Sequence, residues 1–216
     1  MRDKQSLGAI IRQKDQERVN MSKRKAKVVR ETNETVVKAE IEIDGSGESS
    51  IKTGIGFFDH ILILMAAHGR FNIFLEASGD VYVDNHHTVE DVGITLGMAF
   101  NEALGDRVGI NRYGHALIPM DEALSQVVID LSRRPFVVYE APPMAERIGT
   151  MESELVPEFL RAFAQHGGIT LHARILYGTN SHHMVESLFK ALGRALHEAS
   201  SLSNFYSGVP STKGSL

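Results

Sequence analysis

The chain has 216 residues, of which 43% are hydrophobic and 23% are charged, a balance that is typical of a folded globular protein and excludes overall disorder. It contains no cysteine, which excludes disulfides, thiolate nucleophiles and cysteine-ligated metal centres, so any metal must be held by histidine and carboxylate. The longest apolar run, residues 61–67, is too short to cross a membrane, and no apolar segment follows the charged start. We therefore expect a cytoplasmic protein without a membrane partner.

The net charge of −4 is unevenly distributed. Residues 1–30 carry ten Lys and Arg against three Asp and Glu, whereas the other 186 carry thirteen against twenty-four. A basic start can serve as a nucleic-acid arm, but no aromatic side chains interleave these charges, and the acidic body argues against nucleic-acid binding. We interpret residues 1–25 as a disordered, solvated extension, with Met21 as an alternative start of the protein.

The first half of the remaining chain predicts the order β-β-α-β-α. Apolar residues alternate with charged ones over residues 37–43, which is typical of a half-buried strand. A second strand is expected over 49–53, a buried helix over 57–68 and a third strand over 71–77. A long helix over 86–104 follows the Asp84-Asn85 cap.

The second half repeats this order, with strands expected over 125–131, 135–139 and 169–176 and helices over 153–165 and 182–200. His86-His87-Thr88-Val89-Glu90 aligns with His182-His183-Met184-Val185-Glu186, and Leu96-Gly97 aligns with Leu192-Gly193 at the same offset. The sequence therefore predicts an α+β fold built from a duplicated β-β-α-β-α unit, in which each half packs a sheet on helices. We place the halves at residues 26–108 and 109–216.

The duplication preserves polar residues that suit a metal. On a helix, Glu90 lies on the face of His86 and His87, and Glu186 stands in the same relation to His182 and His183. Histidine nitrogen and carboxylate oxygen without sulfur suit manganese, iron, zinc or nickel. Adjacent histidines point about 100° apart on a helix, so each pair is expected to divide between two ions, with the repeats or neighbouring subunits supplying complementary ligands.

Further ligands are expected eight residues before each of two His-Gly pairs. His60 stands at this position in the first half and Glu158 in the second. His172, on an expected strand, is the alternative to Glu158, although we favour a hydrogen-bonded structural role for it. His68 and His166 are interpreted as the ends of helices.

A second group of residues suits an anion. Arg112 lies in the link between the halves, Arg134 joins two strands, and the C-terminal segment contains Ser211 and Lys213. Guanidinium groups and an ammonium group favour a phosphate monoester. The chain has no GxxxxGK[ST] loop, GxGxxG fingerprint or GxSxG elbow, which disfavours the common nucleotide sites and serine hydrolases.

Seven motifs in order carry a resemblance to a known family. They are Arg30-Glu31-Thr32-Asn33-Glu34-Thr35, Gly56-Phe57-Phe58-Asp59-His60, Asp84-Asn85-His86-His87-Thr88-Val89-Glu90-Asp91, Pro119-Met120-Asp121-Glu122-Ala123, Asp130-Leu131-Ser132-Arg133-Arg134-Pro135, Asn180-Ser181-His182-His183 through Glu186, and Pro210-Ser211-Thr212-Lys213-Gly214. From about Lys27 to the C-terminus, the chain resembles the monofunctional form of imidazoleglycerol-phosphate dehydratase.

The resemblance implies a hydro-lyase of histidine biosynthesis that converts D-erythro-imidazoleglycerol phosphate into imidazoleacetol phosphate, the sixth step of that pathway. It also implies two Mn²⁺ ions per active site and a 24-subunit homo-oligomer with active sites at subunit contacts. Glu34 matches the acid/base residue of the family. The implied phosphate-binding residues are Arg112, Arg134, Ser211 and Lys213, and the implied metal ligands are His60, His86, His87, Glu90, Glu158, His182, His183 and Glu186.

Two functions of other classes explain the histidine motifs alone. One is a dimetal hydrolase, which would use the same ligands to activate water. The other is a metal-storage or metal-sensing protein without an enzymatic activity. Neither accounts for the arginines, the Ser-Thr-Lys segment or Glu34, so we favour the dehydratase.

Overall fold

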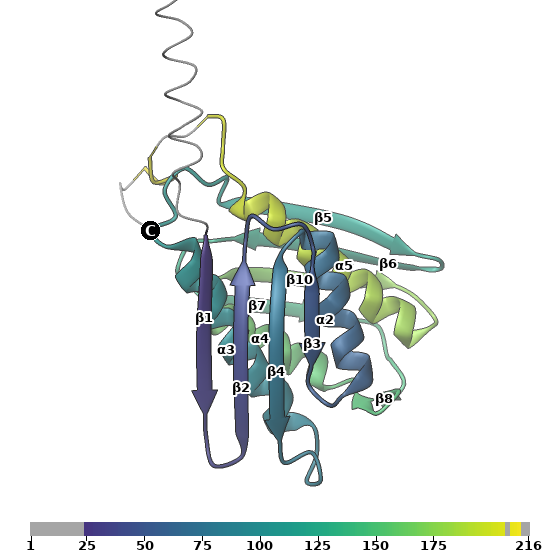
Figure 1. The fold of residues 1–216 in the computed structure, drawn as a ribbon. Helices are drawn as coiled ribbons and strands as arrows, with labels where there is room; N and C mark the ends of the chain where they lie inside the picture. The colour runs from purple at the N-terminus through teal and green to yellow at the C-terminus, as the bar shows by residue number, and fades with distance from the viewer. Residues whose placement is uncertain (1–23, 206–207, 213–216) are drawn as a thin grey trace, which may run out of the picture.

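The computed structural model describes residues 24–205 and 208–212 of the chain (Figure 1). The expected extension lies outside the described residues, apart from Arg24 and from Lys25, which begins the first strand. The described part of the first half contains β1 (Lys25–Glu31), β2 (Thr35–Glu42), β3 (Ser49–Lys52), α2 (Gly56–Gly69), β4 (Asn72–Gly79) and α3 (His86–Leu104). The second half contains β5 (Tyr113–Met120), β6 (Ala123–Asp130), β7 (Phe136–Glu140), α4 (Leu155–Gly167), β10 (Thr170–Tyr177) and α5 (Ser181–Ser200).

The two halves have the same sheet topology. The strand order is β1-β2-β4-β3 in one sheet and β5-β6-β10-β7 in the other, with the last pair of each sheet parallel and the others antiparallel. Their registers also correspond, because Lys25 pairs with Glu42 in β1 and β2 as Tyr113 pairs with Asp130 in β5 and β6. The expected duplicated α+β fold is therefore confirmed, and residue n of the first hairpin corresponds to residue n + 88 of the second.

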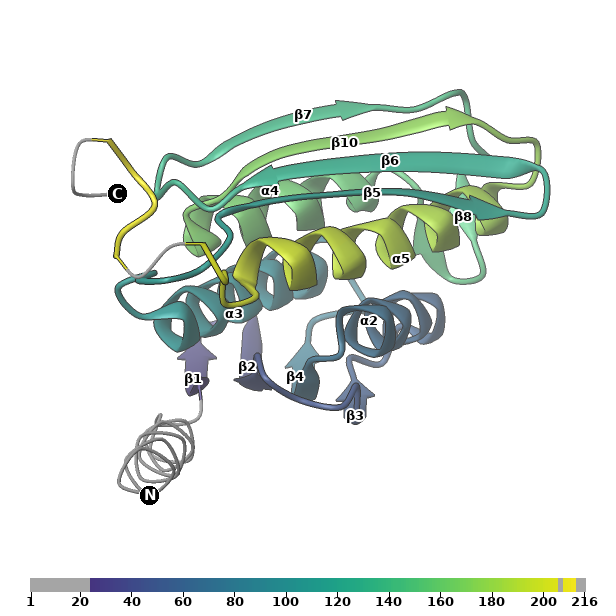
Figure 2. The same ribbon diagram turned by 90° about the horizontal axis from the view of Figure 1, so that it is seen from above.

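The helices lie between the sheets (Figure 2). α2 and α3 cover the inner face of the first sheet, while α4 and α5 cover the inner face of the second. α3 packs against α4 and α2 packs against α5, so each helix of one half contacts a helix of the other. These contacts between the halves explain why ligands from different halves of the sequence can meet.

Two equivalent glycines allow the helices to approach closely. A Cβ atom on Gly193 of α5 would lie 2.4 Å from the carbonyl oxygen of Met65 in α2. A Cβ atom on Gly97 of α3 would lie 2.6 Å from the carbonyl oxygen of Phe163 in α4. Any larger residue would force the helices apart, so both positions require glycine.

The first strand of each half, β1 or β5, was not expected from the sequence. β1 and β5 each form one edge of their sheet, opposite β3 and β7, and one row of their backbone groups has no neighbouring strand. β1 carries the Lys and Arg residues that we assigned partly to a solvated extension, and β5 contains Gly114 and Pro119, which weaken a strand signal. The short hairpin of β8 (Arg147–Ile148) and β9 (Met151–Glu152) was also not expected.

The link between the halves is held by a buried arginine. Arg107 donates from its guanidinium group to Asn101 Oδ1 at 2.6 Å and to the carbonyl oxygens of Gly167 and Gly168, at 2.7 and 3.0 Å. These carbonyls end α4, where the helix dipole favours a positive charge.

Within the described residues, no helix is long and apolar enough to cross a membrane.

Candidate metal centre and basic pocket

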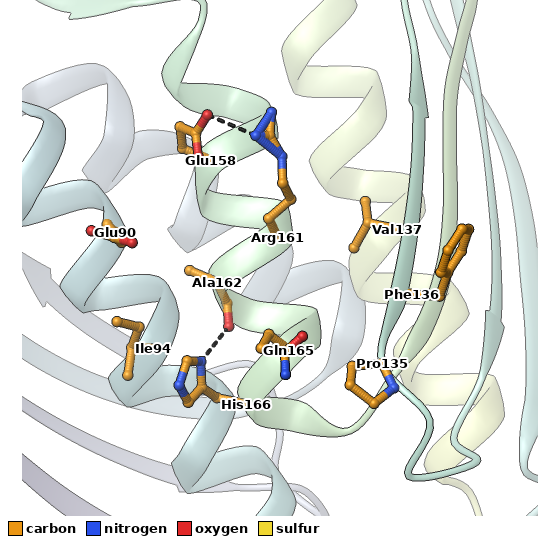
Figure 3. A pocket seen from close by; sticks show the side chains of 10 residues that line it. All are labelled: Glu90, Ile94, Pro135, Phe136, Val137, Glu158, Arg161, Ala162, Gln165 and His166. Carbon is orange, nitrogen blue, oxygen red and sulfur yellow. Dashed lines mark hydrogen bonds and ion pairs between the residues drawn. The ribbon is translucent and has the colours of Figure 1, made fainter.

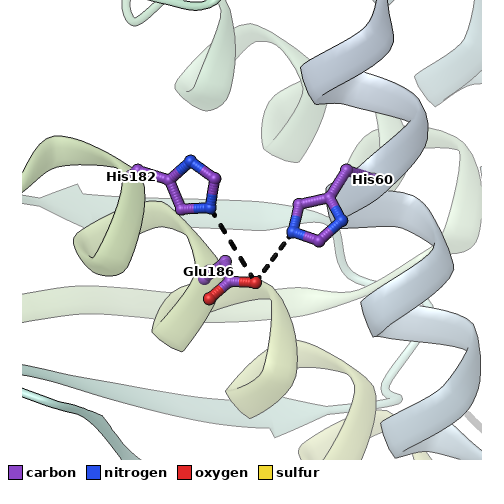
Figure 4. Close-up of side chains that lie close together, drawn as sticks. All are labelled: His60, His182 and Glu186. Carbon is purple, nitrogen blue, oxygen red and sulfur yellow. Dashed lines mark hydrogen bonds and ion pairs between the residues drawn. The ribbon is translucent and has the colours of Figure 1, made fainter.

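His60, His182 and Glu186 form a compact cluster between α2 and α5 (Figure 4). One ligand atom from each residue lies within 4.8 Å of the other two. His60 Nε2 lies 2.8 Å from Glu186 Oε1, and His182 Nε2 lies 4.0 Å from the same oxygen. The structure therefore brings together two predicted ligands of the second half and one of the first.

The surroundings of Glu186 stabilise its carboxylate. Burial alone would raise the pKa of Glu186, but the bond to His60 and the ammonium group of Lys190, 3.3 Å from Oε2, outweigh this effect and lower the pKa. The ring centroid of Phe57 lies 5.0 Å from that of His182, beside the cluster. Two imidazoles and an ionised carboxylate are a donor set that divalent transition metals accept.

Helix caps place the histidine pairs in the first turns of α3 and α5. Asn180 Oδ1 accepts from the backbone amides of His182 and His183, at 2.9 and 3.4 Å. At α3, Asp84 Oδ1 accepts from the amide of His86 at 2.8 Å. Both sequences thus supply a side-chain acceptor for amides that have no partner within the helix.

The rings within each pair are nearly perpendicular, as helix geometry predicts. The interplanar angle is 86° for His86 and His87 and 90° for His182 and His183. The second histidine of each pair contacts an acid through Nδ1, which lies 3.0 Å from Asp80 Oδ2 in His87 and 2.8 Å from Glu122 Oε2 in His183.

These acids favour the protonated form of the second histidines. The bond to Asp80 raises the pKa of His87, and the bond to Glu122 raises that of His183. The same bond to His183, together with backbone donors, lowers the pKa of Glu122 to about 2. Neither Asp80 nor Glu122 was expected in the site. No spacing rule connects Glu122, in a hairpin, with a histidine 61 residues later, and Asp80 lies in the loop seven residues before His87, outside the His-His-x-x-Glu motif.

The predicted ligands on α3 and α4 do not come together as those on α2 and α5 do. Glu90 and Glu158 line one pocket of about 470 Å³ (Figure 3). Glu158 Oε1 accepts from Arg161 Nη1 at 2.8 Å, one turn along its own helix, and Glu90 is exposed. Among the described residues, His86, Glu90 and Glu158 do not form a cluster like that of His60.

The other histidines lie away from the cluster at α2 and α5. His172 is exposed on the outer face of the second sheet, while the candidate ligand helices cover the inner face. Our interpretation of His172 as a hydrogen-bonded structural residue is wrong, because its side chain points to solvent and bonds to no described residue. His68 and His166 lie in the last turns of α2 and α4, as expected, and His166 Nδ1 lies 3.0 Å from the carbonyl oxygen of Ala162.

Glu34 lies in the hairpin between β1 and β2, beside the α3 histidines. Its carboxylate is exposed, and Oε2 lies 3.7 Å from His87 Nδ1. An exposed carboxylate beside a candidate metal ligand can exchange protons with a bound molecule.

Three of the four predicted anion-binding residues, Arg112, Arg134 and Ser211, line a pocket of about 700 Å³. Arg112 donates to both oxygens of Asp130, at 2.7 and 3.1 Å, and to the carbonyl oxygen of Pro210 at 2.8 Å. Arg134 Nη2 lies 3.6 Å from Asp130 Oδ2. Lys213 lies outside the described residues. The described lining residues are Asn111, Arg112, Tyr113, Arg134, Val209, Pro210, Ser211 and Thr212.

Comparison with known proteins gives a consistent result. Residues 53–196 match the family model for imidazoleglycerol-phosphate dehydratase. The chain is 55% identical over 194 residues to the enzyme of that name from Syntrophobacter fumaroxidans, covering 90% of this chain and 98% of the relative. It is 59% identical over 191 residues to the one from Clostridium botulinum, covering 88% and 97%.

Solved structures of the same name share the fold. The structure from Staphylococcus aureus has a TM-score of 0.75 and 37% sequence identity, and the match covers 83% of this chain and 99% of that one. The structure from Pyrococcus furiosus has a TM-score of 0.76 and 35% identity, with coverage of 88% and 100%.

Proposed function

The chain belongs to the imidazoleglycerol-phosphate dehydratase family, and from this premise we propose that it is a manganese-dependent hydro-lyase. Its substrate would be D-erythro-imidazoleglycerol phosphate and its product imidazoleacetol phosphate, in the sixth step of histidine biosynthesis. The observation that carries this proposal is the gathering of His60, His182 and Glu186 in a chain that also has an arginine-lined pocket.

The donor set fits two Mn²⁺ ions per active site. Imidazole nitrogen and carboxylate oxygen, without thiolate, are ligands that Mn²⁺ accepts. When bound, the ions would supply positive charge at the imidazole ring of the substrate and favour its deprotonated, electron-rich form. The electrons of this form would help the hydroxyl group to leave from the carbon next to the ring. We assign the ligands to His60, His86, His87, Glu90, Glu158, His182, His183 and Glu186.

The chain's own residues would move the proton and hold the phosphate. Glu34 would take the proton from the middle carbon of the side chain, which leaves an enol that becomes the ketone product. Arg112 and Arg134, with Ser211 and Lys213, would bind the phosphate and fix the reacting carbons. Asp130 holds the Arg112 guanidinium group in place, so that it is oriented before the substrate binds.

The distance between the two parts of the site supports an oligomeric enzyme. The backbone amide of Arg112 donates to Ala199 at the C-terminal end of α5, whereas His182 stands at its N-terminal end. The helix between them is about 25 Å long at about 1.5 Å per residue. The three-carbon chain of the substrate is shorter than three extended residues, which span about 10 Å.

One substrate molecule therefore cannot contact both the cluster at His182 and the pocket at Arg112 of the same chain. We propose that active sites form between subunits, in the 24-subunit homo-oligomer that the family implies. No nucleic acid or membrane is required by this arrangement.

The proposal is tested by incubating purified protein with imidazoleglycerol phosphate and measuring the ketone product. We expect turnover after loading with Mn²⁺, none after exhaustive chelation, and recovery when Mn²⁺ is restored. A dimetal hydrolase would release inorganic phosphate instead, and a storage protein would bind metal without turnover. Full activity of the chelated protein would overturn the metal assignment.

A further inference from the structure

Glu122 and Glu34 occupy equivalent positions in the duplicated fold. The register of β1 and β2 maps onto that of β5 and β6 with an offset of 88, which maps Glu34 onto Glu122. Each carboxylate ends the hairpin turn immediately before the second strand of its sheet, and each lies near Nδ1 of the second histidine of its half. The two glutamates nevertheless have different contacts.

The carboxylate of Glu122 is fixed on both sides. Its Oε1 accepts from the backbone amides of Thr179 and Asn180, at 3.1 and 2.7 Å, and from the Thr179 hydroxyl at 3.3 Å. Its Oε2 lies 2.8 Å from His183 Nδ1. Because an ionised carboxylate can only accept, His183 must carry a proton on Nδ1. Its Nε2 lies 3.8 Å from Asp121 Oδ2, which is too long for a hydrogen bond, so the lone pair of Nε2 can bind an ion when the ring is neutral.

Glu34 is not held in this way. Its side chain is 54% exposed and its Oε2 is 3.7 Å from His87 Nδ1, which is too long for a hydrogen bond. In this half Asp80 makes the close contact, with both oxygens 3.0 to 3.2 Å from Nδ1. The orienting contact thus comes from a different residue in each half.

We propose that Glu122 is a positioning residue that holds His183 with its Nε2 directed to an ion, and that Asp80 does the same for His87. Because Asp80 fills this role in the first half, Glu34 is left free to contact the substrate. This inference rests on the proposed metal-binding function and adds two residues to it. The duplication has thereby produced, at equivalent positions, one glutamate whose carboxylate is held by hydrogen bonds and one whose carboxylate is not.

The variant Glu122→Gln tests the proposal sharply. Three donors face Oε1, so the amide oxygen of the glutamine must take that place and its NH₂ group must face His183 Nδ1. An NH₂ group donates to an unprotonated Nδ1, which moves the ring proton to Nε2 and blocks ligation. The loop contacts of residue 122 are retained, so the change acts on the ring of His183.

We expect Glu122→Gln to weaken binding of one Mn²⁺ ion at least tenfold, measured at fixed pH from the free Mn²⁺ signal in electron paramagnetic resonance. Glu122→Asp, which remains an acceptor, should recover part of this affinity. Asp80→Asn should weaken the ion held by His87 to a similar extent. Glu140→Gln is the matched control, because Glu140 pairs with Arg174 away from the candidate ligands and its neutralisation should leave Mn²⁺ binding unchanged.

Two results would overturn the positioning role. One is Mn²⁺ affinity in Glu122→Gln equal to that of the wild type. The other is a fall in the melting temperature of the metal-free variant relative to Glu140→Gln, which would make Glu122 an anchor of the loop. If the wild type binds no Mn²⁺, the proposed function itself fails and the positioning role fails with it.

Discussion

The two helix contacts, α2 with α5 and α3 with α4, are related by the duplication, but they present different side chains. Between α2 and α5, His60 faces Glu186 and the two form a hydrogen bond. Between α3 and α4, the residue equivalent to His60 is Glu158, which faces the pocket that Glu90 also lines. An imidazole attracts a carboxylate, whereas two carboxylates repel each other unless a cation lies between them.

This difference shows that the His-His-x-x-Glu motif does not assemble a ligand set by itself. Both copies of the motif stand at helix starts with capped amides. The residue that the neighbouring helix presents decides whether the glutamate of the motif has a partner. His60 of α2 contacts Glu186, whereas Glu158 of α4 pairs with Arg161 on its own helix. We therefore expect the cluster at α2 and α5 to bind its ion more tightly than the ligands at α3 and α4.

The largest effect is expected from Glu186→Ala. This change removes the hydrogen bond to His60 and leaves the ammonium group of Lys190 without its carboxylate. Turnover should fall to background, and the affinity for one ion should fall tenfold to a hundredfold. Metal content measured by mass spectrometry should be compared with that of Glu90→Ala, which should keep the ion of the His60, His182 and Glu186 cluster. If Glu186→Ala bound two ions with the affinity of the wild type, the proposed difference between the two ligand sets would be wrong.

The close helix contacts predict a second effect. Gly193→Ala places a Cβ atom 2.4 Å from the Met65 carbonyl, and Gly97→Ala places one 2.6 Å from that of Phe163. Each should destabilise the protein by about 1–3 kcal/mol in urea unfolding, since the clash outweighs the helix propensity gained. Gly56→Ala is the control, because a Cβ atom there meets open space. Equal stability of Gly193→Ala and Gly56→Ala would show that the helices separate without cost.

The pairing at Glu158 predicts a third effect. Glu158→His would repeat the arrangement of His60, so it should retain the second ion and substantial activity. Glu158→Ala should lower the affinity for that ion about tenfold. His172→Ala should leave metal stoichiometry unchanged, because its side chain lies on the outer face of the second sheet. Glu158 is not a ligand if Glu158→Ala binds two ions as tightly as the wild type.

The smallest effect concerns equivalent positions in the sheets. Tyr139 of β7 stands where the first half has the apolar Ile51, and its buried hydroxyl has no partner among the described residues. Tyr139→Phe should therefore stabilise the protein by about 1 kcal/mol in urea unfolding at pH 8. A lower stability of Tyr139→Phe would show that the hydroxyl makes a favourable contact.

The same residue predicts a pH dependence. Burial raises the pKa of Tyr139 to about 12, while an unfolded tyrosine titrates near about 10. Between these values the unfolded state binds fewer protons, so the free energy of unfolding of the wild type should fall as the pH rises. Tyr139→Phe should lack this contribution, which unfolding curves from pH 9 to 12 would reveal as a growing difference between the two proteins.

Much of the fold could be predicted because the repeats share both hydrophobic periodicity and polar residues. The helices of His86 and His182 follow from the motifs and their caps, strands β2 and β4 follow from alternation, and strands β6 and β10 follow from the repeated order of elements in the second half. β1 and β5 were missed, since charged or glycine- and proline-containing outer strands have weak patterns. The contacts of Glu122 and Asp80 could not be predicted, because they depend on which loop ends beside which helix.

The central claim is that the metal cluster and the basic pocket of one active site come from different chains. Co-expression of His182→Ala, which lacks a candidate ligand, with Arg112→Ala, which lacks a phosphate contact, tests it directly. Each variant alone should be inactive. In mixed oligomers with equal amounts of the two chains, about a quarter of the sites should combine an intact cluster with an intact pocket, so about a quarter of wild-type turnover should return. Mixed oligomers that remain inactive would contradict the claim and place the whole site within one chain.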